Sequence, residues 1–119
     1  MAFKKKILIC DDEEGVRESL KLILEDAYDL AFASCGDEAI KKAKAESFDL
    51  AILDIKMPKM SGIDALKELK KVSPYLKVIM ASGYKSVEAA NEAIRNGASD
   101  YMVKPFESKE VLEKVAKYA

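Results

Sequence analysis

Histidine is absent from the 119 residues of this chain, and so are glutamine and tryptophan. Without histidine, a histidine-ligated metal site, a Ser/His/Asp triad and a phosphohistidine on this chain are all excluded. Cysteine is scarce as well, with Cys10 and Cys35 alone. Because the sequence shows no signal peptide, we expect two reduced thiols rather than a disulfide.

Long apolar runs and a dominant charge are also missing. No run approaches the roughly 20 apolar residues of a membrane span, so we expect no membrane association and a cytoplasmic location. The 20 basic and 21 acidic residues give a formal net charge of -1, which provides no electrostatic reason to expect direct nucleic-acid binding. Charged residues make up 34% of the chain, and their enrichment without glutamine hints at a thermophilic source.

The sequence does contain five short apolar runs, each followed by an amphipathic segment. We interpret residues 1–119 as one domain of alternating strands and helices, without a linker or repeat. Because each crossover contains a helix, the strands should be parallel and the crossovers right-handed. The expected strands cover 7–10, 28–34, 50–53, 76–81 and 100–103, and the expected helices cover about 14–27, 39–46, 63–72, 87–95 and 110–119.

The fold class that follows is a doubly wound α/β domain with a five-stranded parallel sheet. The first, third and fourth strands are the most apolar, so they should be central and the order should be 2-1-3-4-5. Helix signals are local: Asp12 could cap the first helix, and Ser86 the fourth. In the last helix, Val111, Leu112 and Val115 are expected to face inward.

Polar residues stand where four of the expected strands end. Asp11 and Asp12 follow the first strand, Asp54 the third, Ser82 the fourth and Lys104 the fifth. The first and third strands flank the topological switch point, where ligands bind in such sheets. Three carboxylates meeting there should repel one another and raise at least one pKa. An all-oxygen site of this kind suits Mg²⁺.

A metal, a lysine and a hydroxyl around one carboxylate fit phosphoryl transfer. Asp54 would be the nucleophile and form an acyl phosphate. Mg²⁺ and Lys104 would neutralise charge on the phosphoryl oxygens, with Ser82 as a further donor.

These residues resemble the receiver domain of bacterial two-component response regulators along the whole chain. The resemblance rests on Asp11-Asp12, Asp54, the loop from Met57-Pro58 to Gly62, Ser82, and Lys104-Pro105, each at the family's spacing. It implies the flavodoxin-like fold of CheY, in which the strands have this same order. It further implies a phosphoacceptor signalling domain, which is not an enzyme beyond catalysing its own phosphorylation and dephosphorylation.

The resemblance implies roles for individual residues. Asp54 would receive a phosphoryl group from a phosphohistidine on a sensor histidine kinase or a histidine phosphotransfer protein. Asp12 and Asp54 would bind Mg²⁺ directly, Asp11 through water, and the Lys56 backbone carbonyl would be another ligand. Lys104 would hold the phosphoryl group or Asp54, before a cis bond to Pro105.

The resemblance also implies a switch and an output. Ser82 would move towards the phosphoryl group and Tyr101 would turn inward behind it. The face of the fourth helix, fifth strand and fifth helix would then signal to a downstream effector that the sequence does not identify. Lys56 and Tyr84 stand where the family tunes dephosphorylation, so the lifetime of the phosphate stays open.

A finer likeness is to single-domain phosphorelay intermediates of the sporulation type, carried by residues 11–17 and Lys56. The last helix runs to the end of the chain, which favours a stand-alone regulator over part of a longer one. We expect a monomer, with dimerisation on phosphorylation as an open alternative. The expected docking residues for the kinase are Gly15, Val16, Ser19, Pro105 and Phe106.

Three other functions compete with this reading. A flavin- or nucleotide-binding module should have a Gly- or Ser/Thr-rich phosphate loop after the first strand, where this chain has Asp-Asp-Glu-Glu. A hydrolase with an aspartyl-phosphate intermediate would place an acid two residues after its nucleophile, where this chain has Lys56. A degenerate receiver that only binds proteins would not need the full set of acids, hydroxyl and lysine.

Overall fold

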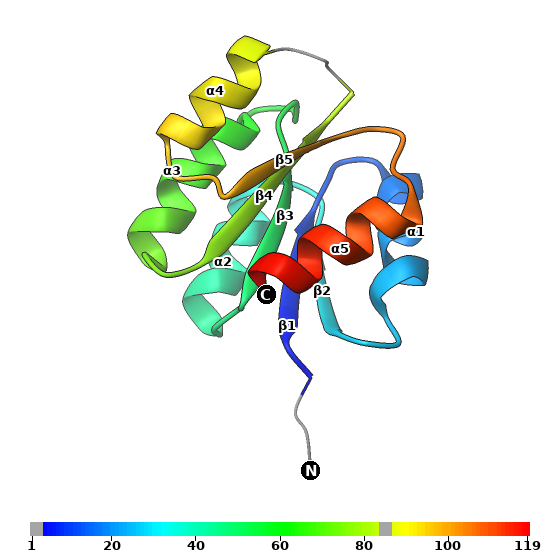
Figure 1. Cartoon of the computed structure of the whole chain (residues 1–119). Helices are drawn as coiled ribbons and strands as arrows, with labels where there is room; N and C mark the ends of the chain where they lie inside the picture. Colours follow the sequence, from blue (N-terminus) through cyan, green and yellow to red (C-terminus); the bar gives the residue numbers. More distant parts are fainter. Residues whose placement is uncertain (1–3, 84–86) are drawn as a thin grey trace.

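A computed structural model describes residues 4–83 and 87–119. The strands form one parallel sheet in the order β2-β1-β3-β4-β5, as expected. Helices α2, α3 and α4 cover one face of the sheet, and α1 and α5 cover the other (Figure 1). The elements are β1 (Lys6–Cys10), α1 (Glu14–Leu24), β2 (Asp29–Ala33), α2 (Gly36–Ala45), β3 (Leu50–Asp54), α3 (Gly62–Val72), β4 (Lys77–Ser82), α4 (Val87–Arg95), β5 (Asp100–Val103) and α5 (Ser108–Tyr118).

The three central strands are buried almost throughout. Every residue of β3 is buried, and β1 and β4 expose only their first lysine, whereas β2 is half-exposed along most of its length. Continuous apolar runs are what a strand covered by helices on both faces requires. The apolarity of the runs therefore predicted the strand order.

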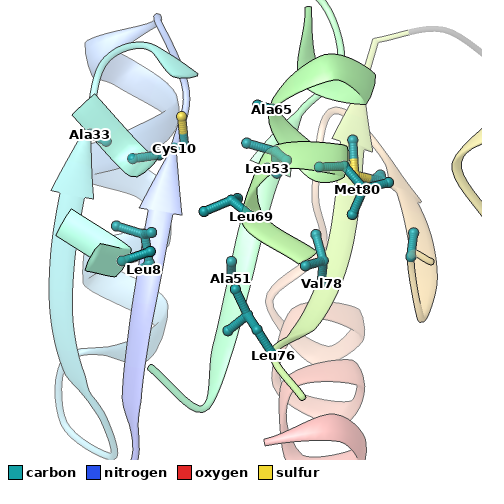
Figure 2. Close-up of a cluster of buried hydrophobic side chains, with 14 of the residues drawn as sticks. Leu8, Cys10, Ala33, Ala51, Leu53, Ala65, Leu69, Leu76, Val78 and Met80 are labelled. Atoms are coloured by element: carbon teal, nitrogen blue, oxygen red, sulfur yellow. The ribbon is translucent and has the colours of Figure 1, made fainter. Parts of the chain in front are cut away.

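Alternate residues of each strand enter two separate cores. Leu8, Ala51 and Val78 pack under α2, α3 and α4 (Figure 2), together with Leu66 and Leu69 of α3. The residues between them on the same strands point to α1 and α5. That second core contains Ile7, Ile9, Leu20, Leu24, Leu50, Ile52, Ile79, Ala81, Met102, Val111 and Val115.

Helix α1 begins at Glu14 as predicted, but its cap and its end differ from the sequence prediction. The helix ends at Leu24 rather than near Ala27, because the chain turns there to begin β2: the amides of Ala27 and Tyr28 both donate to the Leu24 carbonyl. Asp12 does not cap the helix. The N-cap residue is Glu13, and its amide donates to Asp11 Oδ1 at 2.9 Å.

The prediction for α5 was wrong at Leu112, which is 41% exposed. Val111 and Val115 are four residues apart and share the face against the sheet, so Leu112 lies about 100° around the helix from Val111.

The expected cap at Ser86 lies outside the described residues. Cys10 and Cys35 are free thiols. Across residues 4–83 and 87–119, no helix has the length and apolarity needed to cross a membrane.

Candidate functional site

The parallel sheet brings the predicted site residues to its carboxyl edge. Asp54 is the last residue of β3 and pairs in register with Ala81, one residue before Ser82 at the end of β4. Lys104 follows β5, and its amide donates to the Ser82 carbonyl at 2.8 Å. The cavity at this edge is lined by Asp12, Glu13, Asp54, Lys56, Met57, Pro58, Ser82, Gly83 and Lys104.

Buried polarity is concentrated at this one edge. Within the described part of the chain, the buried polar side chains are Asp11, Asp54 and Ser82, at 2%, 4% and 1% exposure. Burying a polar or charged group without partners costs free energy, so buried groups of this kind are normally hydrogen-bonded or paired with an opposite charge. Asp12 differs, since it is exposed on the open side of the cavity.

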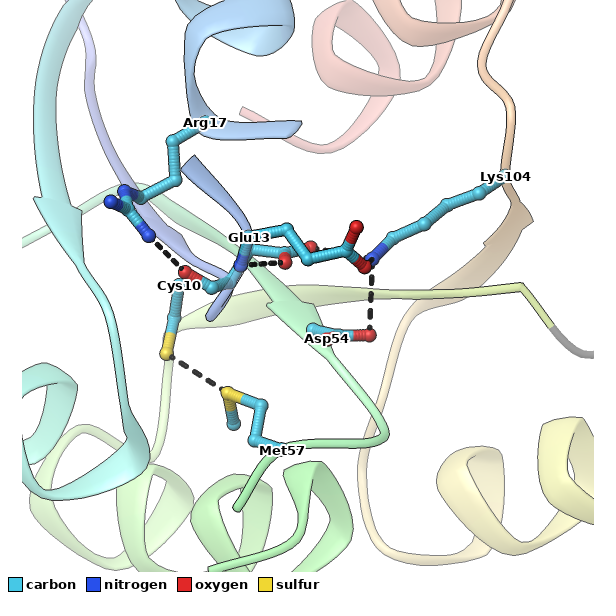
Figure 3. A network of polar contacts seen from close by, with 7 residues as sticks. Cys10, Glu13, Arg17, Asp54, Met57 and Lys104 are labelled. Carbon is cyan, nitrogen blue, oxygen red and sulfur yellow. Dashed lines mark hydrogen bonds and ion pairs between the residues drawn. The ribbon is translucent and has the colours of Figure 1, made fainter. Parts of the chain in front are cut away.

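Lys104 reaches across the edge and contacts three acids (Figure 3). Its Nζ lies 2.7 Å from Asp11 Oδ2, 3.4 Å from Asp54 Oδ1 and 3.7 Å from Glu13 Oε1. Lys104, Asp11 and Asp54 are all largely buried, so solvent screens these two contacts less than those of surface pairs, whereas the Glu13 side chain is 66% exposed. Lys104 therefore supplies the positive charge that this group of acids needs.

The pKa of Asp54 is raised to about 7. Burial is the largest cause, the charge of Asp11 is the next, and the positive charge of Lys104 opposes both. The sequence predicted a raised pKa from repulsion between acids; the structure adds that burial of Asp54 contributes more. Burial lowers the pKa of Lys104, but its hydrogen bonds and ion pairs with Asp11 and Asp54 outweigh this, and that pKa is raised.

Three carboxylates at this edge could hold a divalent metal ion. Asp11, Asp12 and Asp54 each offer an oxygen, and these oxygens lie within 4.8 Å of one another. Hard oxygen ligands, with one acid on the open side, fit a small divalent cation that keeps part of its water shell. Lys56 lines the same cavity, and the use of its backbone carbonyl as a ligand stays a prediction.

The loop between β3 and α3 sets the backbone around Asp54. The Gly62 amide donates to the Ile55 carbonyl at 2.6 Å. A Cβ on Gly62 would lie 2.0 Å from the Asp54 carbonyl oxygen, so this position needs glycine. Ser61 then caps α3 by accepting a hydrogen bond from the Asp64 amide at 3.2 Å. Pro and Gly predicted a loop here, but not this close approach to Asp54.

The remaining predicted residues lie at or near the same edge. The bond between Lys104 and Pro105 is cis, as expected. Tyr101 is half-buried on β5 and packs against the core under α2, α3 and α4. Its role as a switch stays a prediction, and Tyr84 lies outside the described residues.

Four of the five predicted docking residues lie together in one groove. Val16, Ser19, Pro105 and Phe106 line one groove between α1 and the start of α5, whereas Gly15 is exposed on α1 and is not in its lining. Glu13 lines both this groove and the cavity at Asp54, so the two are adjacent.

Two further residues contact Lys104 and Asp11 and were not predicted from the sequence. Glu13 contacts Lys104, and Arg17 Nη1 donates to the Asp11 carbonyl at 2.8 Å. Glu13 looked like an ordinary acid near a helix start. Arg17 carried a usable signal, because a cation is unusual in the first turns of a helix.

Comparisons with known proteins agree with this arrangement. The sequence profile described as "Response regulator receiver domain" matches residues 7–116. The chain is 42% identical over 115 residues to the chemotaxis protein CheY of Thermotoga maritima, and the match covers 95% of this chain and 96% of that protein. It spans only 23% and 47% of two transcriptional regulatory proteins that also match.

Solved structures give the same result. A CheY-like receiver domain protein from Methanospirillum hungatei superposes with a TM-score of 0.92 at 37% identity, covering 97% of this chain and 93% of that one. The CheX-CheY-BeF3-Mg complex from Borrelia burgdorferi matches with a TM-score of 0.91 at 30% identity, covering 95% and 87%. With its strand order, its acids at the carboxyl edge and a profile match over nearly its whole length, the chain belongs to the response regulator receiver domain family, whose general function is to accept a phosphoryl group.

Proposed function

We propose that Asp54 is the phosphoacceptor of this receiver domain, in an Mg²⁺-dependent reaction. The observation that carries the proposal is the placement of Asp54: it is 4% exposed at the end of a central strand, with two further acids within reach and Lys104 Nζ at 3.4 Å. Asp11 shares these neighbours, but its Oδ2 is held by Lys104 at 2.7 Å and its Oδ1 by the Glu13 amide. Asp54 lines the open cavity, whereas Asp11 does not.

The proposed chemistry is the transfer of a phosphoryl group from a phosphohistidine. An Asp54 oxygen attacks phosphorus, the bond from phosphorus to the histidine nitrogen breaks, and the imidazole nitrogen takes up a proton. Lys104 and the Ser82 hydroxyl interact with the phosphoryl oxygens as charge builds up there. A bound Mg²⁺, held by Asp12, Asp54 and the Lys56 carbonyl, and by Asp11 through water, would offset the negative charge of the acids and the phosphoryl group.

The state of Asp54 gives this scheme a testable requirement. A nucleophilic carboxylate must be ionised, yet the pKa of Asp54 is raised to about 7 by burial and by Asp11. A nearby cation favours the ionised form. A divalent ion at the acids would therefore both hold the donor phosphate and keep Asp54 reactive at neutral pH.

The proposed partners follow from the groove beside the cavity. A sensor histidine kinase or a histidine phosphotransfer protein would dock on Val16, Ser19, Pro105 and Phe106, which line a groove that also includes Glu13 and Lys104. The Borrelia burgdorferi CheY complex contains BeF3 and Mg, which supports an anion and a divalent ion meeting at such a site. We further propose that residues 1–119 form one receiver domain that is cytoplasmic and monomeric, with dimerisation on phosphorylation as the alternative. Its downstream effector is not identified by the sequence.

The test is the intact mass of the protein after incubation with Mg²⁺ and a small phosphodonor such as acetyl phosphate. We expect one added phosphoryl group in the natural chain, and none without Mg²⁺ or in Asp54→Asn. Asp49→Asn is a matched control, because Asp49 lies one residue before β3, at the opposite end of that strand from Asp54. An adduct that persists in Asp54→Asn would contradict the proposal, and so would an adduct that forms equally well without Mg²⁺.

A further inference from the structure

The loop from β1 to α1 carries two of the three clustered acids, and hydrogen bonds hold its backbone in place. The Asp11 amide donates to the Ala33 carbonyl of β2 at 3.1 Å. The Asp11 carbonyl accepts from Arg17 Nη1 at 2.8 Å (Figure 3). The Asp11 side chain is held separately by Lys104 and by the Glu13 amide. Arg17 is thus the side chain that fixes the carbonyl end of this residue.

Arg17 stands against a local preference of helices. Its amide donates to the Glu13 carbonyl at 3.2 Å, which places it at the end of the first turn of α1. The amino end of a helix carries partial positive charge and favours acids, so a cation there is unfavourable. Helical side chains lean towards the amino end, which lets the half-buried guanidinium reach back to the loop. A residue that breaks a local rule is expected where function compensates.

The bond from Arg17 bears on Asp12. The Asp11 carbonyl and the Asp12 amide belong to one rigid peptide plane. The hydrogen bond from Arg17 to that oxygen restrains rotation of the plane. It thereby restrains the direction in which the Asp12 side chain leaves the backbone. Asp12 is the exposed member of the three acids, whose oxygens lie within 4.8 Å of one another and repel. Without a restraint on the plane, the loop can relieve the repulsion by turning Asp12 away.

We infer that Arg17 is a positioning residue for the divalent-cation site. Among the described residues, its side chain donates to the Asp11 carbonyl and forms no ion pair with the three acids; it holds the peptide that orients Asp12 towards Asp11 and Asp54. The inference rests on the proposed function in one respect, namely that these acids bind Mg²⁺. It predicts that the loss of Arg17 weakens cation binding and leaves the chemistry at Asp54 intact once the cation is bound.

The experiment is a direct Mg²⁺ titration, followed by the backbone amide resonances of residues 10–13 and 54. Arg17→Met keeps the length of the side chain and removes its donors. We expect Mg²⁺ affinity to fall by about tenfold, the lower end of the range for groups that orient metal ligands. Lys21→Met is the matched control, because Lys21 is an exposed cation one turn further along α1. That variant should bind Mg²⁺ like the natural chain.

A kinetic measurement separates positioning from general damage. With acetyl phosphate, Arg17→Met should need more Mg²⁺ for half-maximal phosphorylation but reach nearly the natural rate at saturating Mg²⁺. Arg17→Leu, which also removes the donors, serves the same purpose if Arg17→Met does not fold. Natural Mg²⁺ affinity in either folded variant would overturn the inference, and so would an equal loss in Lys21→Met. If the natural chain bound no Mg²⁺, both this inference and the proposed metal site would be wrong; binding without phosphorylation would count against the proposed function alone.

Discussion

Burial is the main cause of the raised pKa of Asp54. The side chain is 4% exposed, and its pKa rises to about 7, first because of burial and then because of the charge of Asp11. Between about pH 4 and pH 7 the folded chain therefore binds more protons at this residue than the unfolded chain does. Stability must fall as the pH rises through that window, because the unfolded state releases the proton more readily.

Asp54→Asn should remove this pH dependence. In metal-free buffer, we expect the free energy of unfolding of the natural chain to fall between pH 5 and pH 8 by on the order of 2 kcal/mol relative to the variant. Urea unfolding at a series of pH values measures the difference, and added Mg²⁺ should reduce it. Parallel pH profiles for the two chains would show that Asp54 does not titrate in this range.

At the scale of residues, the predictable members of the site are those whose position in the chain determines their position in space. Asp54, Ser82 and Lys104 each follow a strand, and a parallel sheet must bring them to one edge. Glu13 and Arg17 were missed because their contacts depend on the direction of long side chains, which spacing alone does not give.

At the scale of elements, the loop after β3 couples the backbone of Asp54 to the start of α3. Gly62 allows this because a Cβ there would lie 2.0 Å from the Asp54 carbonyl oxygen and 2.6 Å from the Ile55 Cα. Both neighbours are backbone atoms, so a side chain can be accommodated only if the loop shifts.

Gly62→Ala should therefore destabilise the protein by about 2 kcal/mol or more, as overpacking against backbone does. Gly15→Ala is the control, because the residue is helical and a Cβ built there meets nothing within 4 Å beyond its chain neighbours and the backbone of its own helix. It should stabilise the chain by up to about 1 kcal/mol. Thermal unfolding of both variants measures this, and equal stability of Gly62→Ala and the natural chain would refute the steric account.

The ends of β4 and β5 are joined close to Asp54. The Lys104 amide donates to the Ser82 carbonyl where β4 and β5 end. At the start of β5, Lys114 of α5 donates to the Tyr101 carbonyl at 2.8 Å and contacts Asp100 at 3.3 Å, which ties this strand to α5. A phosphoryl group on Asp54 that contacts Ser82 and Lys104 would favour one arrangement of these ends over another.

Phosphorylation should consequently shift amide resonances of β5 and of described residues in α4, with smaller shifts in α2. Helix α2 packs on the same face of the sheet but beside β1 and β2, away from this link. Backbone NMR spectra before and after phosphorylation provide the measurement. Unchanged β5 and α4 resonances would show that the predicted switch through Ser82 and Tyr101 does not exist.

Element boundaries were harder to predict than element types. The periodic residues of α1 continue past its end, because turn bonds to Leu24 and the path into β2 determine where it stops. Leu112 was assigned inward from hydrophobicity alone, although the sheet can cover only the stripe that contains Val111 and Val115.

For the whole molecule, the topology was predictable because apolar runs alternate with amphipathic segments and because three of the runs are more apolar than the others. Neither feature predicts how stable the fold is. The hint of a thermophilic source rests on charge content and stays a prediction. Lys114 pairs with both Asp100 and Glu110 and so forms a small ion-pair network. Exposed pairs contribute little at 25 °C and more as networks at high temperature.

If the hint is right, the melting temperature should exceed the roughly 45–65 °C typical of mesophile domains. Differential scanning calorimetry in low salt and in high salt measures it, and salt should lower the value if surface ion pairs contribute. A melting temperature inside the mesophile range would remove the hint without affecting the fold or the site.

The most direct test of the account is to locate the phosphoryl group. After incubation with Mg²⁺ and acetyl phosphate, borohydride reduction converts an aspartyl phosphate to homoserine, which peptide mass spectrometry places in the sequence. The account predicts homoserine at position 54 and unmodified acids at positions 11 and 12. Modification at either of those acids, with position 54 unchanged, would contradict the assignment of Asp54 as the phosphoacceptor.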